Sequence, residues 1–159
     1  EFNTAAKVNP PLRTEQDRLA LIEGVRDGTI DCIATDHAPH TDWEKDADFD
    51  SAPFGISGLE TALGVCVHTL VAPGLLTWSQ LIERMSTAPA SLIGAQTGTL
   101  RVGAQADVAI IDPAAQWTVD SKHFVSKGRR SPFEGSSLTG RVVQVLHRGV
   151  EVNVHERRP

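Results

Sequence analysis

The chain has 159 residues, a net charge of −5, 40% hydrophobic and 22% charged residues, which are ordinary values for a soluble globular protein. The acidic balance and the lack of a lysine- or arginine-rich block argue against a nucleic-acid surface. No apolar run approaches the roughly 18 residues that a membrane-spanning helix needs. Cys32 and Cys66 lack Cys-x-x-Cys spacing, which indicates buried thiols in a reducing compartment rather than a disulfide.

Helix and strand signals alternate at the start of the chain. Thr14, with Asp17 three residues later, forms a capping pair that predicts the start of a helix. Gly28 is a stop signal for this helix, and the apolar run of residues 30–35 then predicts a buried strand. A helix followed by a strand in this order is typical of a barrel built from both elements.

A long loop separates this strand from further helices. Residues 36–58 are rich in Asp, Pro and Gly, and loops of this length in compact domains are usually functional or disordered. An apolar stripe then predicts a helix over residues 59–70. Thr77 and Thr87 open two shorter helical segments.

The last third of the chain has the pattern of short strands. Residues 106–113 predict a strand that a proline ends, and residues 117–119 predict a short one. A further strand is predicted from residue 140. Residues 145–152 form two arms around Arg148-Gly149, which predicts a hairpin.

The most informative motif is Thr-Asp-His-Ala-Pro-His at residues 35–40, directly after the predicted strand. Carboxylates and imidazoles bind zinc and move protons near neutral pH. Such groups gather at the carboxyl ends of barrel strands in parallel α/β enzymes. An ordinary turn is the alternative interpretation, because Asp and Pro both favour turns.

Two further strings accompany this motif. Lys-Val-Asn-Pro-Pro-Leu-Arg lies at residues 7–13, and Pro-Phe-Gly-Ile-Ser-Gly-Leu-Glu-Thr-Ala lies at residues 53–62. With all three strings in order, the chain resembles the dihydroorotases of the amidohydrolase superfamily, in particular their C-terminal part. Hydantoinases and allantoinases share the Pro-Pro-Leu/Ile-Arg string and an Asp-His after a strand. The Lys-Val-Asn start, His40 and the Pro-Phe-Gly-Ile loop favour dihydroorotase.

The resemblance implies an α/β fold, the C-terminal portion of a (β/α)8 TIM-type metal-dependent hydrolase barrel followed by strands of a small β-sandwich. Residues 1–97 would form the last barrel strands and helices with the active-site loops, and residues 98–159 the sandwich portion. A full barrel takes about 250 residues, and the family's His-x-His ligand pair does not occur in this sequence. We therefore expect a C-terminal fragment that exposes an open apolar face and is inactive alone.

Five residues match functional positions of that family. The aspartate that matches Asp36 binds metal there and acts as the acid and base that moves the proton of the attacking water. The resemblance assigns substrate contact to His40, Asn9 and the backbone of Phe54 and Gly55. The alternatives are an ordinary loop histidine, an asparagine that favours the turn before two prolines, and a phenylalanine that is an apolar plug.

Other polar residues near these motifs receive more modest interpretations. His37 could orient Asp36 as an outer-sphere group or be structural. Lys7 and Arg13 are interpreted as structural, because the carboxylate-binding arginine of the family lies near the His-x-His strand.

The function that the resemblance implies is reversible, zinc-dependent cyclisation of N-carbamoyl-L-aspartate to L-dihydroorotate in pyrimidine biosynthesis in the cytoplasm. One or two zinc ions would bind, with most ligands outside residues 1–159, and the partner would be a small molecule. The alternatives are a hydantoinase or allantoinase activity, or a non-catalytic scaffold for aspartate carbamoyltransferase. The sequence leaves open a homodimer and a complex with that transcarbamoylase.

Overall fold

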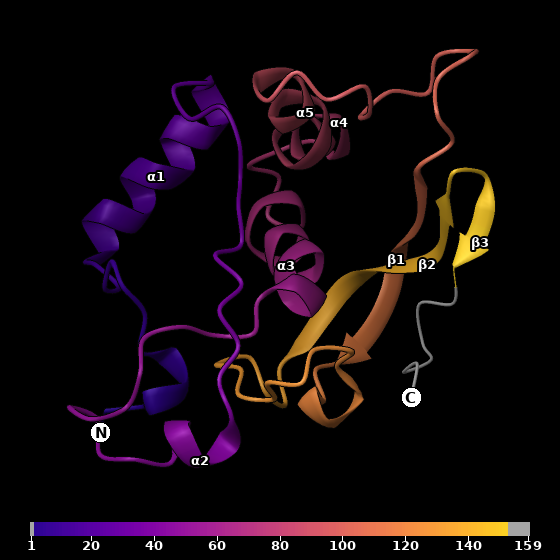
Figure 1. Cartoon of the computed structure of the whole chain (residues 1–159). Helices are drawn as coiled ribbons and strands as arrows, with labels where there is room; N and C mark the ends of the chain where they lie inside the picture. The colour runs from indigo at the N-terminus through magenta and orange to yellow at the C-terminus, as the bar shows by residue number, and fades with distance from the viewer. Residues whose placement is uncertain (1, 153–159) are drawn as a thin grey trace.

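The computed structural model describes residues 2–152. Its elements lie in two groups, a helical part and a small twisted sheet, with irregular segments around α1 and α2 (Figure 1). The helices are α1 (Glu15–Asp27), α2 (Asp42–Lys45), α3 (Leu59–Cys66), α4 (Trp78–Ile82) and α5 (Ala88–Leu92). The strands are β1 (Val108–Thr118), β2 (Ser137–His147) and β3 (Val150–Val152). Short 3-10 turns cover Thr4–Ala6 and Ser121–His123, and π-helical turns cover Val67–Val71 and Glu83–Thr87.

The predicted cap of the first helix is confirmed. The Thr14 hydroxyl accepts a hydrogen bond from the Asp17 amide at 3.3 Å, and the Asp17 carboxylate accepts one from the Thr14 amide at 3.1 Å. Hydrogen bonds from the Thr14 hydroxyl and amide hold the pKa of Asp17 below its ordinary value. The helix ends at Gly28, whose φ of 91° is the left-handed conformation that glycine adopts freely.

The later helices also follow their sequence signals. Helix α3 and the π-helical turn up to Val71 together cover the predicted apolar stripe. Thr77 caps α4 with Gln80, and the segment predicted from Thr87 forms α5. A first apolar core joins α1 to α3 and the π-helical turn that follows it. Its buried members are Val25, Leu70 and Leu76, with Ile22, Ile30, Ile33 and Cys66 packed against them.

The predicted strand over residues 30–35 is wrong, because the structure assigns no strand there. The segment passes between α1 and α3 as an irregular trace (Figure 1). The Ile33 amide donates to the Arg84 carbonyl at 3.0 Å, and Ile33 packs in the core. An apolar run predicts that a segment is buried, but a strand also needs a ladder of hydrogen bonds with a neighbouring strand. The described part of the chain places no such neighbour beside this run.

The sheet is antiparallel with the order β1-β2-β3. Arg148 and Gly149 have φ of 52° and 79°, and this pair of positive values is typical of a two-residue hairpin turn, as predicted. The predicted end of a strand at Pro113 is wrong, since β1 continues to Thr118 and includes the second short strand. Proline is tolerated because the pairing register shifts between Asp112 and Gln116, on a strand at the sheet edge.

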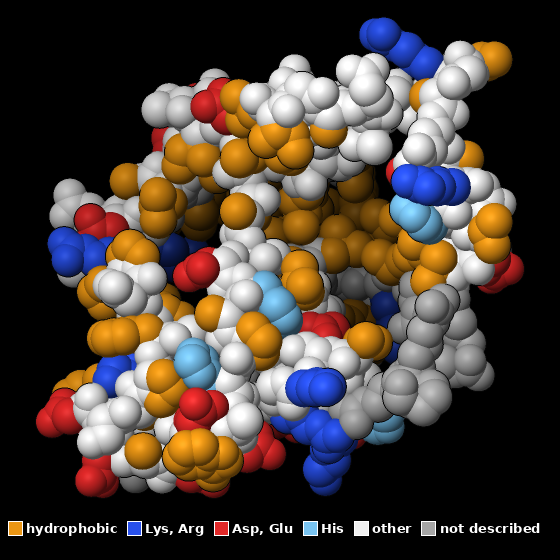
Figure 2. Space-filling model, in the orientation of Figure 1, with side chains coloured by type: hydrophobic (Ala, Val, Ile, Leu, Met, Phe, Trp, Pro, Cys, Tyr) orange, Lys and Arg blue, Asp and Glu red, His pale blue; other side chains and the backbone are white. Residues whose placement is uncertain are grey.

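The sheet packs against α3 at very short range. A Cβ atom on Gly64 would lie 3.0 Å from side-chain atoms of both Leu138 and Trp117. A second apolar core of Val119, Phe124 and Leu138 lies at this contact. The division into parts 1–97 and 98–159 stays a prediction, and the two parts share this contact. Figure 2 shows a hollow lined with hydrophobic side chains between the helices and the sheet.

Truncation of the most buried leucine tests the packing of the helical part. Leu81 of α4 is fully buried, at 0% exposure. We expect Leu81→Ala to lower the free energy of unfolding by about 2–5 kcal/mol, because the cavity forfeits apolar burial and contacts. Leu92→Ala, at a position with 62% exposure, should change it by less than about 0.5 kcal/mol. Urea denaturation followed by circular dichroism measures both, and equal losses would contradict the burial of Leu81.

Candidate active site

Two loops that are distant in sequence lie side by side and form the candidate site. His37 and Ile56 form an isolated parallel bridge, and the Ala38 amide donates to the Ile56 carbonyl at 3.0 Å. The Asp-His-Ala-Pro-His motif therefore lies against the Pro-Phe-Gly-Ile loop. The sequence could not place these loops together, because the contact joins residues about twenty positions apart.

Three of the predicted substrate-binding residues meet where the two loops touch. The Nε2 atom of His40 lies 2.9 Å from the carbonyl oxygen of Phe54, so Nε2 carries a proton and donates. Gly55 follows with a φ of 127°, and a Cβ there would lie 2.6 Å from the Ala38 carbonyl oxygen. Only glycine permits this approach of the loops.

Asp36 lies at the start of the motif with its side chain exposed. Its φ of 44° is in the left-handed region, which non-glycine residues adopt rarely and which concentrates at functional sites. No described residue forms a hydrogen bond or an ion pair with its carboxylate, which is therefore free to bind a cation or accept a proton.

His37 caps a helix. Its Nδ1 atom accepts from the amides of Gly58 at 3.1 Å and Leu59 at 3.3 Å, the first amides of α3. The sequence left a structural and an outer-sphere role open, and these bonds support the structural one. They also require Nδ1 to be unprotonated, so the proton of the neutral ring is on Nε2.

Asn9 lies apart from these contacts. Its side chain is exposed, and the peptide bond to Pro10 is cis. The side-chain amide of Asn9 forms no hydrogen bond with any residue between 2 and 152. Its segment nevertheless reaches the site, because the carbonyl of Lys7, two residues earlier, accepts from the Gly55 amide at 3.0 Å.

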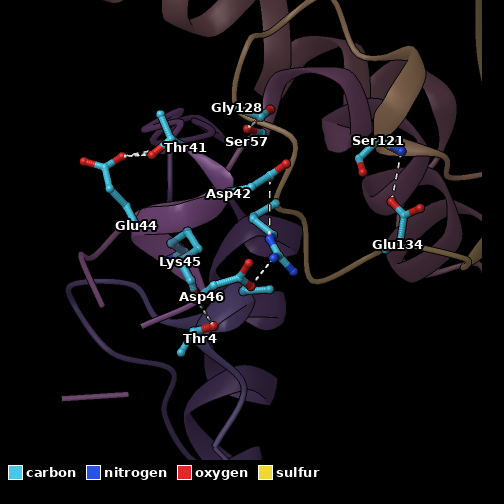
Figure 3. A network of polar contacts seen from close by, with 12 residues as sticks. Thr4, Thr41, Asp42, Glu44, Lys45, Asp46, Ser57, Ser121, Gly128 and Glu134 are labelled. Atoms are coloured by element: carbon cyan, nitrogen blue, oxygen red, sulfur yellow. Dashed lines mark hydrogen bonds and ion pairs between the residues drawn. The ribbon is translucent and has the colours of Figure 1, made fainter. Parts of the chain in front are cut away.

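The last third of the chain also contributes to the site, which the sequence did not indicate. A Cβ on Gly128 would lie 2.5 Å from the Pro39 Cβ and 2.9 Å from the His40 carbonyl oxygen. The Ser57 hydroxyl donates to the Gly128 carbonyl at 2.7 Å (Figure 3). Arg130 pairs with Asp42 at 3.5 Å and, more closely, with Asp46. Nothing in the local pattern around Gly128 signals this role.

A complete metal site is not formed by the residues described. Within residues 2–152, no group of three or more His, Cys, Asp or Glu side chains could hold a metal ion. A free carboxylate at Asp36 fits a single ligand of a hard or borderline cation such as zinc. The remaining ligands would have to come from elsewhere, as the sequence predicts.

The chain belongs to the amidohydrolase family, whose sequence model matches residues 6–152. It is 51% identical over 149 residues to a dihydroorotase of Acetivibrio thermocellus, covering 94% of the chain and 35% of that protein. It is 53% identical over 139 residues to a dihydroorotase of Pelotomaculum thermopropionicum, covering 87% and 33%. The chain thus spans about a third of the length of these relatives.

Solved structures resemble this fold closely. A dihydropyrimidinase from Brevibacillus agri matches with a TM-score of 0.87 and 28% identity, over 97% of this chain and 35% of that chain. An L-hydantoinase from Arthrobacter aurescens matches with a TM-score of 0.86 and 35% identity, over 96% and 35%. The expected fold class is confirmed: the chain is a partial α/β unit of the amidohydrolase TIM-barrel fold with a small antiparallel sheet. No described helix is long and apolar enough to cross a bilayer.

Proposed function

We propose that the chain is the C-terminal part of a dihydroorotase, a cyclic amidohydrolase that interconverts N-carbamoyl-L-aspartate and L-dihydroorotate. The observation that carries this is the junction of His40 with Phe54 and Gly55, formed by the same motif that contains the free carboxylate of Asp36. Identity of about 50% to dihydroorotases supports it over the hydantoinase alternative. Pyrimidine synthesis in the cytoplasm would be its setting.

The junction offers groups that suit a cyclic ureide. Phe54 uses its carbonyl to bind His40, and Gly55 uses its amide to bind the Lys7 carbonyl. The Phe54 N–H and the Gly55 carbonyl have no hydrogen-bond partner among the described residues. One donor and one acceptor from adjacent residues complement the carbonyl and N–H of a ureide ring. Because Nε2 of His40 donates to the Phe54 carbonyl, His40 would bind the ring carboxylate through Nδ1–H of its imidazolium form, at an atom that lies 3.7 Å from Glu44 Oε2. Asn9 would add an amide.

Asp36 is the proposed acid and base. An exposed carboxylate without a protein partner can take a proton from the attacking water and return it to the leaving amide nitrogen. Zinc bound there, as one or two ions with further ligands outside this chain, would supply water of lowered pKa and polarise the amide carbonyl. The residues of this chain would bind and orient the ring.

Substrate preference tests the proposal. We expect the intact protein, loaded with zinc, to open dihydroorotate with a kcat/KM at least about 100-fold higher than for hydantoin or allantoin, measured by ring-opening absorbance. A site that pairs polar groups with a ring carboxylate leaves those groups unpaired when the substrate has no carboxylate. Faster turnover of hydantoin would favour the hydantoinase alternative. An intact protein that binds no zinc yet co-purifies with aspartate carbamoyltransferase would favour the scaffold alternative. The 159-residue chain alone should be inactive.

A further inference from the structure

Two lysines are buried beside the candidate site with no carboxylate partner. Lys7 is 8% exposed and Lys45 is 1% exposed. Lysine is almost never buried this fully unless it is paired. Within residues 2–152, neither ammonium group lies within ion-pair distance of an acidic side chain. Burial, and secondarily the neighbouring Lys7 charge, lower the pKa of Lys45. The bonds that the two ammonium groups form, which an apolar side chain could not form, must therefore explain why lysines occupy these buried positions.

The partners of the Lys7 ammonium are backbone carbonyls of one loop. Its Nζ donates to the carbonyls of Phe49 at 2.6 Å, Asp50 at 3.1 Å and Ala52 at 2.7 Å. It also lies 4.6 Å from the centre of the Phe54 ring, at cation-π distance. Three carbonyls turned toward one cation fix the path of the loop up to Phe54.

Lys45 fixes the next peptide unit. Its Nζ donates to the Pro53 carbonyl at 2.9 Å and, more weakly, to the Lys7 carbonyl at 3.4 Å. The carbonyl of Lys45 itself accepts from the Thr4 hydroxyl at 2.6 Å, as Figure 3 shows. In a planar trans peptide the N–H points opposite to the carbonyl. With the Pro53 carbonyl held by Lys45, the N–H of Phe54 must point away from the lysine.

Together these bonds determine which backbone groups of Phe54 and Gly55 stay available to a ligand. Lys45 sets the direction of the Phe54 N–H, His40 engages the Phe54 carbonyl, and the Lys7 carbonyl engages the Gly55 amide. Lys7 is also two residues from Asn9. The two lysines therefore join the loop of residues 49–55 to the segment that contains Asn9 and to α2, the helix that follows His40.

We propose that Lys7 and Lys45 are positioning residues, which hold the loop of residues 49–55 through its carbonyls so that it presents its backbone to a cyclic ureide. This inference rests on the proposed function and deepens it. Neither lysine touches the substrate. An ammonium suits this task because it donates in several directions to neutral carbonyls, which a methionine of similar length cannot do.

Kinetics of methionine variants in the intact, zinc-loaded enzyme test the proposal. We expect Lys45→Met to raise KM for dihydroorotate about tenfold while kcat changes less than about threefold and zinc content stays the same. Lys7→Met should have the same or a larger effect. The matched control is Lys127→Met, at an exposed lysine, which should leave both constants unchanged.

Amide hydrogen exchange of the same variants gives a second readout that does not depend on turnover. Exchange should accelerate in residues 46–55 and stay unchanged in α1. If Lys7→Met does not fold, Lys45→Met decides. Unaltered KM and unaltered loop exchange in Lys45→Met would overturn the positioning role. Wild-type enzyme that leaves dihydroorotate unopened would instead overturn the proposed function, and the exchange data would still report whether the lysines hold the loop.

Discussion

Asp36→Asn in the intact, zinc-loaded enzyme is expected to lower kcat for dihydroorotate by at least about 1,000-fold. Asparagine keeps the size of the side chain but cannot take up a proton at neutral pH, and it is a weaker ligand for zinc. No described residue engages the carboxylate of Asp36, so the substitution removes no internal hydrogen bond. The loss of activity should therefore come without a loss of folded protein.

The measurement combines ring-opening rates with zinc content and thermal denaturation. Asp31→Asn is the matched control, since Asp31 is an exposed acid in the same segment, and this variant should keep wild-type activity. Near-normal turnover by Asp36→Asn would remove the assignment of Asp36 as acid and base. Equal losses in both variants would point to a general effect on the segment.

Local signals in the sequence predicted the local structure well. The capping pair of Thr14 and Asp17, the stop at Gly28 and the turn at Arg148-Gly149 each involve residues within a few positions of one another. The interactions that stabilise each of these structures lie within the motif itself, so each can be predicted without knowledge of the remaining fold. The candidate site residues were found by motif, and the structure brings His40, Phe54 and Gly55 together.

Features that depend on distant partners were not predictable. The apolar run of residues 30–35 reported burial in the core but gave no information on strand pairing. The sequence also gave no sign that Lys45 binds the Pro53 carbonyl or that Gly128 lies against Pro39. Such contacts arise from tertiary packing between segments that are far apart in sequence, and a single charged or small residue gives no periodic signal for them.

Gly55→Ala is expected to lower kcat/KM for dihydroorotate about 100-fold in the intact enzyme. The new Cβ would lie 2.6 Å from the Ala38 carbonyl oxygen and 2.7 Å from the Ala38 Cβ. Neither is the end of a flexible side chain, so the two loops must separate. Separation lengthens the 2.9 Å contact between His40 Nε2 and the Phe54 carbonyl and displaces the backbone that would face the ring.

A second glycine separates the effect of this clash from that of backbone strain. Gly74 also has a positive φ, 78°, but a Cβ there would meet nothing within 4 Å. Gly74→Ala therefore carries a conformational cost of its own, at least about 1 kcal/mol of stability, without moving either loop. We expect it to retain wild-type kcat/KM. If both variants lost activity equally, strain alone would explain the result, and the close approach of the loops at Gly55 would have no part in binding. A selective loss in Gly55→Ala, with unchanged zinc content, would place substrate recognition at the junction of the two loops.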